Sequence, residues 1–472
     1  MANYFKAKPK KNLTLAKLKL TIKRLDSNGV GVAYLSNNNH EKPQQKPVFI
    51  AGALPNEQVQ VQLIEQKNKY AKAKLLKVIV ANENRETPQC AHFYSCGGCD
   101  LQHLSVSEQL NFKQQKVTEL FNRQGINTTL PWQKALTASP WHYRRKARVG
   151  VQYNKNGQAT VGFRRQASNQ LQPIKNCPVL VMPLADIFIQ LNQVLSKLSQ
   201  SKSLGHIEVI YCQPFQGDDN NKLTANNTEL ISLVLRQLKP LNEQDAQCWQ
   251  TFAQQQSLAQ GNKSHWQILV DDGEQVTPLT TSKPLYFYPT KEIKINFESN
   301  DFIQVNNVIN QKMVAQAIHW LELSPEDKVL DLFCGLGNFT LPMAKIIDNI
   351  VGIEGVTTMV QRAKQNALAN NINNVDFYQV DLNNAWLEQP WAKHQYSKAI
   401  LDPARAGAFI AVEQLIQLNI ATILYVSCDA STLATDSKVL ITAGYQIIKI
   451  ALMDMFTHTK HSETMVLFQR SN

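Results

Sequence analysis

Apolar segments alternate with helical segments along the C-terminal part of the chain, from about residue 300 onward. The apolar segments are near-continuous runs of β-favouring residues, for example residues 329–333, 349–353 and 423–427. Strands of this kind, separated by helices, are typical of a parallel sheet that is buried on both faces. The pattern therefore predicts an α/β domain over residues 301–472, with a ligand crevice along the carboxyl ends of its strands.

The N-terminal region has a different pattern, in which short β-favouring runs are broken by turn-forming residues between about residues 12 and 80. Five short strands over this length favour a small antiparallel barrel, for which the OB-fold is a good candidate. The sequences GVGVAY and VFIAGALPNE, which begin at Gly29 and Val48, also resemble the TRAM domain that precedes many RNA-modifying enzymes. We therefore expect an OB-fold-like (TRAM) barrel over residues 1–80.

The region between these two parts, residues 81–300, is expected to form a central β-rich domain. Its first part has helical periodicity from about 105 to 124, and packing on the C-terminal domain is one option for that helix. Residues 141–153 and 160–165 look like paired strands rich in arginine and aromatic side chains. This combination suits stacking on unpaired bases while holding phosphates, although an exposed hairpin would also explain it. Residues 200–290 have no pattern that can be assigned.

Composition adds a basic balance, with 49 lysine and arginine residues against 37 aspartate and glutamate residues and a net charge of +12. Such a charge serves solubility or favours a polyanionic partner such as nucleic acid. The N-terminal residues lack the pattern of a secretory signal, and no segment approaches the roughly 18 apolar residues that suggest a membrane span. We therefore expect a soluble, cytoplasmic monomer without a membrane or obligate protein partner.

A glycine turn follows the first strand of the predicted C-terminal sheet, at Gly335 and Gly337. In doubly wound sheets, the backbone of this turn meets a nucleotide-like ligand. Glu354, at the end of the next strand, is placed to accept hydrogen bonds from ribose hydroxyls. A dinucleotide-binding fingerprint would have a third glycine where Thr340 stands, which disfavours a nicotinamide dehydrogenase.

The glycine turn instead resembles motif I of the class I (Rossmann-like) methyltransferases that use S-adenosyl-L-methionine. Two further carboxylates support this interpretation, because Asp381 follows the third strand and Asp402 follows the fourth. Each has a plausible task in the crevice along the strand ends, although any one of them can be a solvated carboxylate. The sequence thus indicates S-adenosyl-L-methionine as cofactor.

Two other residues indicate chemistry at the same edge of the sheet. Cys428 directly follows an apolar strand, and Glu463 directly precedes another. A thiolate that adds to C6 of uracil makes C5 nucleophilic toward a methyl sulfonium, and a base must then remove the C5 proton so that elimination frees the thiol. One cysteine and one carboxylate are the minimum set for this reaction. Cys334 is a rival thiol, but its place in the strand-to-turn bend suits packing.

Four segments together resemble the signature of the RNA 5-methyluridine methyltransferases, namely residues 331–342, 401–408, 425–436 and 458–468. The resemblance implies that Cys428 is the nucleophile and that Glu463 is the proton-abstracting base. It also implies cofactor contacts from a further set of residues, namely Gln304, Phe333, Asn338, Glu354, Asp381 and Asp402. Cytosine C5 enzymes typically carry their cysteine in the loop after the fourth strand, where this chain has none, so uracil is preferred. Arg405, in that loop, is a candidate either for holding a flipped nucleotide or for a salt bridge.

Three cysteines, Cys90, Cys96 and Cys99, form a tight cluster, which in a reducing compartment indicates metal binding or catalysis more than disulfides. His103 as a fourth ligand would give a structural zinc site, whereas Cys177, which precedes a proline, would give four thiolates for an iron–sulfur cluster. The cysteine spacing resembles the ribosomal RNA enzymes of the family, and this implies a 4Fe–4S cluster that shapes an RNA-binding surface.

The sequence therefore predicts an enzyme that uses S-adenosyl-L-methionine to form 5-methyluridine at one uridine of 23S ribosomal RNA. Within the family, a tRNA uracil-C5 methyltransferase is the alternative. A non-catalytic RNA-binding protein, which would use the barrel and the basic strands, is the alternative from another class.

Overall fold

The computed structural model describes residues 17–36, 45–200, 202–214, 228–259 and 264–470. Residues 1–16, which contain the start of the expected barrel and the N-terminal segment without a signal pattern, lie outside the described residues. The chain divides into two compact units, the first comprising Met1–Pro88 with Asp100–Glu108, and the second comprising Gln89–Cys99 with Gln109–Asn472. Within the described ranges, no helix has the length and apolar character needed to cross a membrane.

The first unit contains a six-stranded sheet in the order β1-β5-β6-β4-β3-β2. Its strands are β1 (Lys17–Thr21), β2 (Arg24–Leu25), β3 (Gly31–Ser36), β4 (Gln45–Ile50), β5 (Gln58–Gln66) and β6 (Ala71–Val80). Neighbouring strands are antiparallel, except that β4 and β6 run parallel. The β-favouring run at residues 20–25 is divided between β1 and β2, because the chain changes its hydrogen-bonding partner there. The Ile22 amide donates to the Glu57 carbonyl at 2.9 Å, and the Lys23 amide donates to the Val32 carbonyl at 2.8 Å.

The central part of the second unit is a seven-stranded sheet in the order β13-β12-β11-β10-β7-β8-β9. Its strands are β7 (Lys146–Tyr153), β8 (Ala159–Arg164), β9 (Leu171–Pro173), β10 (Leu204–Cys212), β11 (Glu229–Gln237), β12 (Ser264–Asp271) and β13 (Val276–Pro278). The accompanying helices are α2 (Met182–Ala185), α3 (Ile187–Leu195) and α4 (Glu243–Ala259), and the short strands β14 (Leu285–Phe287) and β15 (Ile295–Phe297) pair with each other. The predicted pairing of the two arginine-rich strands is confirmed, because β7 and β8 are antiparallel neighbours.

A second seven-stranded sheet forms the C-terminal part, in the order β18-β17-β16-β19-β20-β22-β21. Its strands are β16 (Lys328–Leu332), β17 (Asn349–Glu354), β18 (Val375–Gln379), β19 (Lys398–Leu401), β20 (Thr422–Ser427), β21 (Tyr445–Met453) and β22 (Glu463–Arg470). The first five in this order pair in parallel, as predicted, whereas β22 is antiparallel to both β20 and β21.

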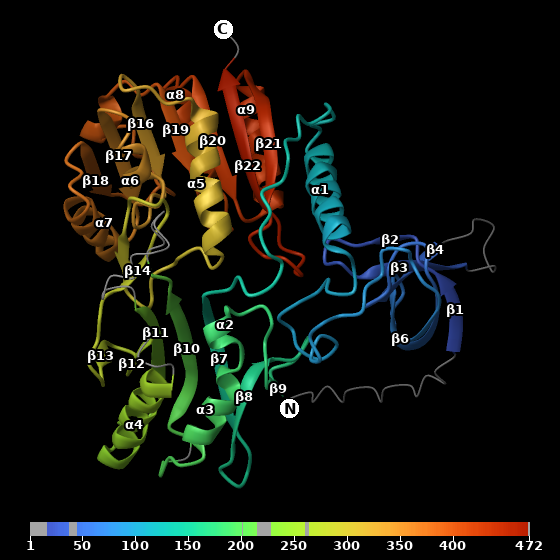
Figure 1. Ribbon diagram of the computed structural model, residues 1–472. Helices are drawn as coiled ribbons and strands as arrows, with labels where there is room; N and C mark the ends of the chain where they lie inside the picture. Colours follow the sequence, from blue (N-terminus) through green and yellow to red (C-terminus); the bar gives the residue numbers. More distant parts are fainter. Residues whose placement is uncertain (1–16, 37–44, 201, 215–227, 260–263, 471–472) are drawn as a thin grey trace, which may run out of the picture. The chain divides into compact units, whose positions relative to one another are not determined.

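Helices cover both faces of this sheet, so its strands are buried on both sides. Val329 and Leu330 are neighbours in β16, yet they pack into two different apolar clusters. The helices are α1 (Val106–Arg123), α5 (Asn307–Leu321), α6 (Thr340–Met343), α7 (Thr357–Ala369), α8 (Phe409–Gln417) and α9 (Ala430–Thr442), with a 3₁₀ turn at Pro390–Lys393. Side chains of α5, α6 and α7 join the first cluster, and side chains of α1, α8 and α9 join the second. Figure 1 shows α5 lying over one face of this sheet, beside β20.

Candidate active site

The turn between β16 and α6 has an unusual backbone, which its glycines permit. Phe333, Gly335 and Gly337 have φ angles of 62°, 56° and 90°, which lie in the left-handed region. A Cβ atom on Gly337 would stand 2.8 Å from the side chain of Leu341, so only glycine fits there without displacement. The sequence prediction of a glycine turn at the end of the first parallel strand is therefore confirmed.

Glu354, at the end of β17, is tied to this turn. One of its carboxylate oxygens accepts a hydrogen bond from the Gly335 amide at 3.1 Å, and the other accepts from the Val356 amide at 3.0 Å. Asn338, within the turn, exchanges two side-chain hydrogen bonds with Asn310 of α5, at 2.9 and 3.0 Å. Both side chains thus lie at the edge where the parallel strands end, in defined orientations.

Asp331 is a buried carboxyl that the sequence prediction missed. It is 1% exposed, and the Thr340 hydroxyl donates to it at 2.5 Å. Burial raises its pKa to about 7; Asp402 and Glu354 add to this effect, while the Thr340 hydrogen bond opposes it. Burial also raises the pKa of Asp402 to about 7. The only sequence signal for Asp331 was a single acidic residue inside an apolar strand.

Gln304 and Asp381, the other two predicted cofactor residues, differ in their exposure. Gln304 is 6% exposed, its carbonyl accepts from Arg145 Nε at 3.0 Å, and its side-chain oxygen has no hydrogen-bond partner within the described part of the chain. Asp381 is exposed and accepts from the side chains of Asn383 and Asn384, at 3.0 and 2.9 Å. Gln304 therefore offers a buried acceptor, whereas Asp381 lies in a hydrogen-bonded surface turn.

Cys428 and Glu463 are brought together by the pairing of β20 with β22. Ser427 pairs with Thr464 in this antiparallel ladder, so the next residues along, Cys428 and Glu463, lie opposite each other. Asp429 then begins α9 by accepting a hydrogen bond from the Ser431 amide at 2.9 Å, which fixes the chain directly after the thiol.

Nearby charges and burial change the pKa values of both Cys428 and Glu463. Burial raises the pKa of the half-buried Cys428 to about 11, with further raising effects from Glu463 and Asp402, whereas Arg405 lowers it. Burial raises the pKa of Glu463 to about 8, Asp402 adds to the rise, and Arg405 again opposes it. Glu463 is 3% exposed, and among the described residues its Oε2 atom has no hydrogen-bond partner. The site thus combines a thiol, a carboxyl group with a raised pKa and the nearby Arg405 cation.

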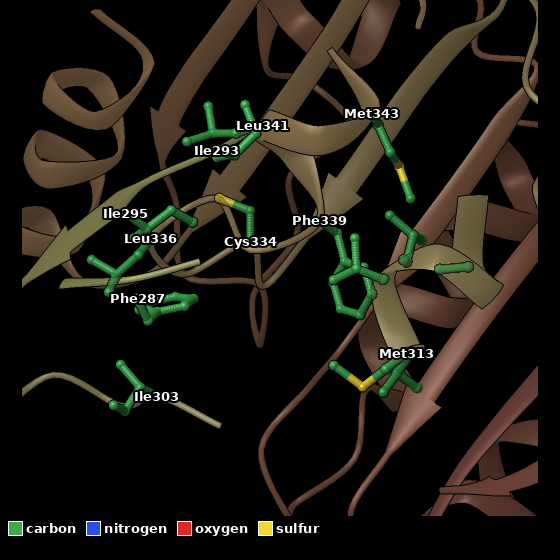
Figure 2. Close-up of a cluster of buried hydrophobic side chains, with 14 of the residues drawn as sticks. Phe287, Ile293, Ile295, Ile303, Met313, Cys334, Leu336, Phe339, Leu341 and Met343 are labelled. Carbon is green, nitrogen blue, oxygen red and sulfur yellow. The ribbon is translucent and has the colours of Figure 1, made fainter. Parts of the chain in front are cut away.

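Cys334 lies away from this pair, in an apolar cluster. Figure 2 shows its side chain among those of Ile293, Ile295, Leu336 and their neighbours. Burial raises the pKa of this thiol well above its usual value, so it stays protonated. These observations agree with the predicted packing role.

The predicted metal ligands belong to the second unit, where some of them interact electrostatically. The loop that carries Cys96 lies beside the end of β8, where the Gly97 amide donates to the Arg164 carbonyl at 2.8 Å. Burial is the main cause of the raised pKa of Cys177, and the Cys90 and Cys96 thiols add to it. Burial likewise raises the pKa of Tyr143, to which Cys99 and Cys177 both contribute.

The described ranges nevertheless contain no group of three His, Cys, Asp or Glu side chains arranged to hold a metal ion. His103, the fourth ligand of the zinc alternative, belongs to the first unit. It is buried there, and burial together with the Arg85 charge lowers its pKa to about 4, against an opposing effect of Glu57.

Comparison with known proteins identifies the family. A family model described as tRNA (Uracil-5-)-methyltransferase matches residues 105–471, and a TRAM domain model matches residues 16–76. The chain belongs to this uracil-5-methyltransferase family. The predicted family, its methyl donor S-adenosyl-L-methionine and the TRAM domain are thereby confirmed.

Relatives match this methyltransferase chain over its whole length. It is 49% identical to the 23S rRNA (uracil(1939)-C(5))-methyltransferase RlmD of Colwellia psychrerythraea, with 100% of both chains covered. It is 42% identical to the protein of the same description from Shewanella sediminis, covering 99% of this chain and 100% of that one. A solved structure of Pyrococcus abyssi tRNA (uracil-54, C5)-methyltransferase, in complex with S-adenosyl-L-homocysteine, has a TM-score of 0.69 at 20% identity and covers 95% of this chain and 99% of that one. That likeness shows the shared methyltransferase fold.

Proposed function

We propose that this methyltransferase forms 5-methyluridine at one uridine of 23S ribosomal RNA. Membership of the family supports methylation at C5 of uracil. The full-length relatives described as 23S rRNA enzymes support 23S ribosomal RNA as the substrate. The observation that carries the chemistry is the placement of Cys428 opposite Glu463 at the ends of β20 and β22.

The reaction begins with the Cys428 thiolate, whose sulfur forms a bond to C6 of the uracil. Electron density then gathers at C5, which attacks the methyl group of the sulfonium, and S-adenosyl-L-homocysteine leaves. Glu463 accepts the proton from C5, the electron pair of that C–H bond restores the C5–C6 double bond, and the C6–S bond breaks to release the thiolate. The high pKa of Glu463, about 8, makes its carboxylate a strong proton acceptor for this last step.

The cofactor is assigned to the crevice formed by the β16 turn and the neighbouring strand ends. Phe333 and Asn338 belong to the turn, Glu354 ends β17 and is hydrogen-bonded to the turn, and Asp402 directly follows β19, whose last residue pairs with that of β16. The side-chain oxygen of Gln304 would accept a hydrogen bond from the ligand, because burying it without a donor is unfavourable. Asp381 is the weakest member of this set, because it is exposed, whereas the other five residues are buried or half-buried.

We further propose that Cys90, Cys96, Cys99 and Cys177 hold the 4Fe–4S cluster. Support comes from the donor chemistry, because thiolate is the usual ligand of iron–sulfur clusters. The Cys90 and Cys96 thiols also contribute to the raised pKa of Cys177, and the Cys99 and Cys177 thiols contribute to the raised pKa of Tyr143. The cluster's role would be to tie the loop at residues 90–99 to the segment around Cys177. Anaerobically purified protein should contain iron and sulfide, and Cys177→Ser should lose both; stoichiometric zinc would contradict this assignment.

A methyl-transfer assay tests the proposed function. The enzyme should transfer radiolabelled methyl groups to 23S ribosomal RNA that lacks the modification, and Cys428→Ala should abolish this transfer while leaving RNA affinity intact. Unmodified tRNA is the parallel substrate, and faster methylation of tRNA would reassign the substrate within the family. RNA binding without turnover on either substrate would favour the non-catalytic alternative.

A further inference from the structure

The connection between β21 and β22, residues 454–462, is buried although connections usually run over the surface. Asp454, His458 and Ser462 are each no more than 4% exposed, and the connection ends at the proposed base, Glu463. Met453 and Glu463 form the last pair of the β21–β22 ladder, so the chain leaves the sheet directly after one and returns directly at the other. This connection therefore directly precedes the proposed base in the chain.

Helix α1, which precedes both β-rich parts of the second unit, supplies the polar groups that hold the connection. Gln109, Lys113 and Lys116 have the i, i+4, i+7 spacing that places side chains on one face of a helix. Lys113, 2% exposed, donates to the Asp454 carboxylate at 2.7 Å and to the Phe456 carbonyl at 3.0 Å. A buried ion pair of this kind is strongly destabilising to break from one side, which favours a single arrangement of the two segments.

The other two side chains extend this contact along the connection. Gln109 Oε1 accepts from the His458 amide at 2.8 Å, and Gln109 Nε2 lies 3.2 Å from His458 Nδ1. Lys116 donates to the Lys460 carbonyl at 3.0 Å. One helix face thus contacts the connection near its start, middle and end.

The middle of the connection is also contacted by Trp141 and Tyr143, which lie outside helix α1. His458 has a φ angle of 68°, in the left-handed region that few residues other than glycine adopt. The Trp141 ring lies on the His458 ring with a centroid separation of 3.9 Å, and the Tyr143 hydroxyl donates to the Thr457 carbonyl at 2.9 Å. The connection is therefore fixed in one conformation by groups outside its own sheet.

We propose that Gln109, Lys113 and Lys116 are positioning residues that direct the Glu463 carboxylate toward the C5 proton. The inference rests on the proposed function, in which Glu463 acts only after methyl transfer. Glu463 is the first residue of β22, and its Oε2 atom has no hydrogen-bond partner in the described ranges. The direction of the Glu463 carboxylate therefore depends on the chain immediately before this residue. Small displacements of a catalytic group slow its step strongly, on the order of a hundredfold per ångström.

Gln109→Leu tests the proposal, because it removes both hydrogen bonds to His458 while keeping a side chain of similar size. With unmodified 23S ribosomal RNA, single-turnover formation of S-adenosyl-L-homocysteine should change by less than about threefold, whereas release of methylated RNA should slow by at least about tenfold. The methylated uridine then stays bonded to Cys428 through C6, and the adduct should accumulate as a shifted band on a denaturing gel. Gln115→Leu is the matched control, since Gln115 is exposed on the same helix, and it should behave as wild type.

Two further variants separate the possible outcomes. Glu463→Gln gives the reference level of adduct, and its failure to accumulate adduct would refute the base assignment in the proposed function instead of the positioning role. Lys116→Met removes a half-buried contact that the fold tolerates more readily, and it should shift the ratio of the two rates in the same direction. The positioning role is wrong if Gln109→Leu or Lys116→Met, whichever folds, slows formation of S-adenosyl-L-homocysteine and release of methylated RNA equally and accumulates no adduct. It is also wrong if neither rate changes.

Discussion

Cys428 lies opposite Glu463 because the β20–β22 ladder pairs Ser427 with Thr464. Because β22 runs antiparallel to β20, Cys428, which follows β20, lies next to Glu463, which begins β22. In a purely parallel sheet, the start of a strand would lie at the edge opposite the carboxyl ends. The antiparallel orientation of β22 thus brings the proposed nucleophile and the proposed base to the same edge as the glycine turn after β16.

Replacing Arg405 with alanine should shift the pH dependence of methyl transfer to higher pH. Arg405 lowers the pKa of both Cys428 and Glu463, and both groups act in their deprotonated forms. Losing the cation raises both pKa values, and the thiolate fraction at a given pH falls about tenfold when the pKa of the thiol rises by about one. Single-turnover rates measured from pH 7 to 10 give the profile. Arg405→Lys keeps the charge and should restore the profile; superimposable profiles for all three proteins would show that Arg405 exerts no such effect.

Glu463→Gln should be more stable than the wild-type protein at alkaline pH. The folded-state pKa of Glu463 is about 8, above the ordinary value of 4.5. A raised folded-state pKa contributes stability below the unfolded-state value, and this contribution is lost as pH rises through about 8. Relative to Glu463→Gln, which does not titrate, the wild type should lose stability between pH 5 and 8, on the order of 1 kcal/mol per pH unit. Urea denaturation across this range measures the difference, and parallel stability curves would contradict the raised pKa.

Gly337→Ala should weaken binding of S-adenosyl-L-methionine. The new Cβ would stand 2.8 Å from Leu341 and would force the turn open, in addition to the strain of a φ angle of 90°. We expect a loss of about 1–2 kcal/mol of stability from the backbone and a larger loss of cofactor affinity. Calorimetric titration with the cofactor measures the affinity. Gly444→Ala is the matched control, because Gly444 has a φ angle of 93° and no atom within 4 Å of the added Cβ. Equal cofactor affinities in the two variants would exclude a role for the turn.

Local sequence patterns were sufficient to predict the parallel sheet, because each buried strand and each following helix has its own periodicity. The reversal of β22 had no such signal, since strand direction depends on the connection of residues 454–462 and not on the strand residues. The split at Ile22 was also hidden, because it arises from a change of hydrogen-bond partner between two distant strands.

For the candidate site, the sequence was sufficient to predict that Cys428, Glu463 and Glu354 adjoin strand ends, because each lies next to an apolar run. Asp331 was missed because an acidic residue in an apolar strand does not by itself reveal a buried hydrogen bond to Thr340. The contact of Lys113 with Asp454 was missed for a different reason: the two residues are 341 positions apart, and no pattern in either segment indicates the other.

Replacing the two cysteines of the catalytic part separately should dissociate stability from activity. Cys334 is 5% exposed and packs in the apolar cluster shown in Figure 2, so Cys334→Ala should leave a small cavity and lose about 1 kcal/mol of stability. Its methyl-transfer rate should remain near the wild-type value, because this thiol does not reach the substrate. Cys428→Ala should show the reverse, with unchanged stability and no transfer, because its thiol supplies the bond to C6. Urea denaturation and the transfer assay, run on the same preparations, distinguish the two. Loss of activity in Cys334→Ala with Cys428→Ala still active would exchange the two assignments.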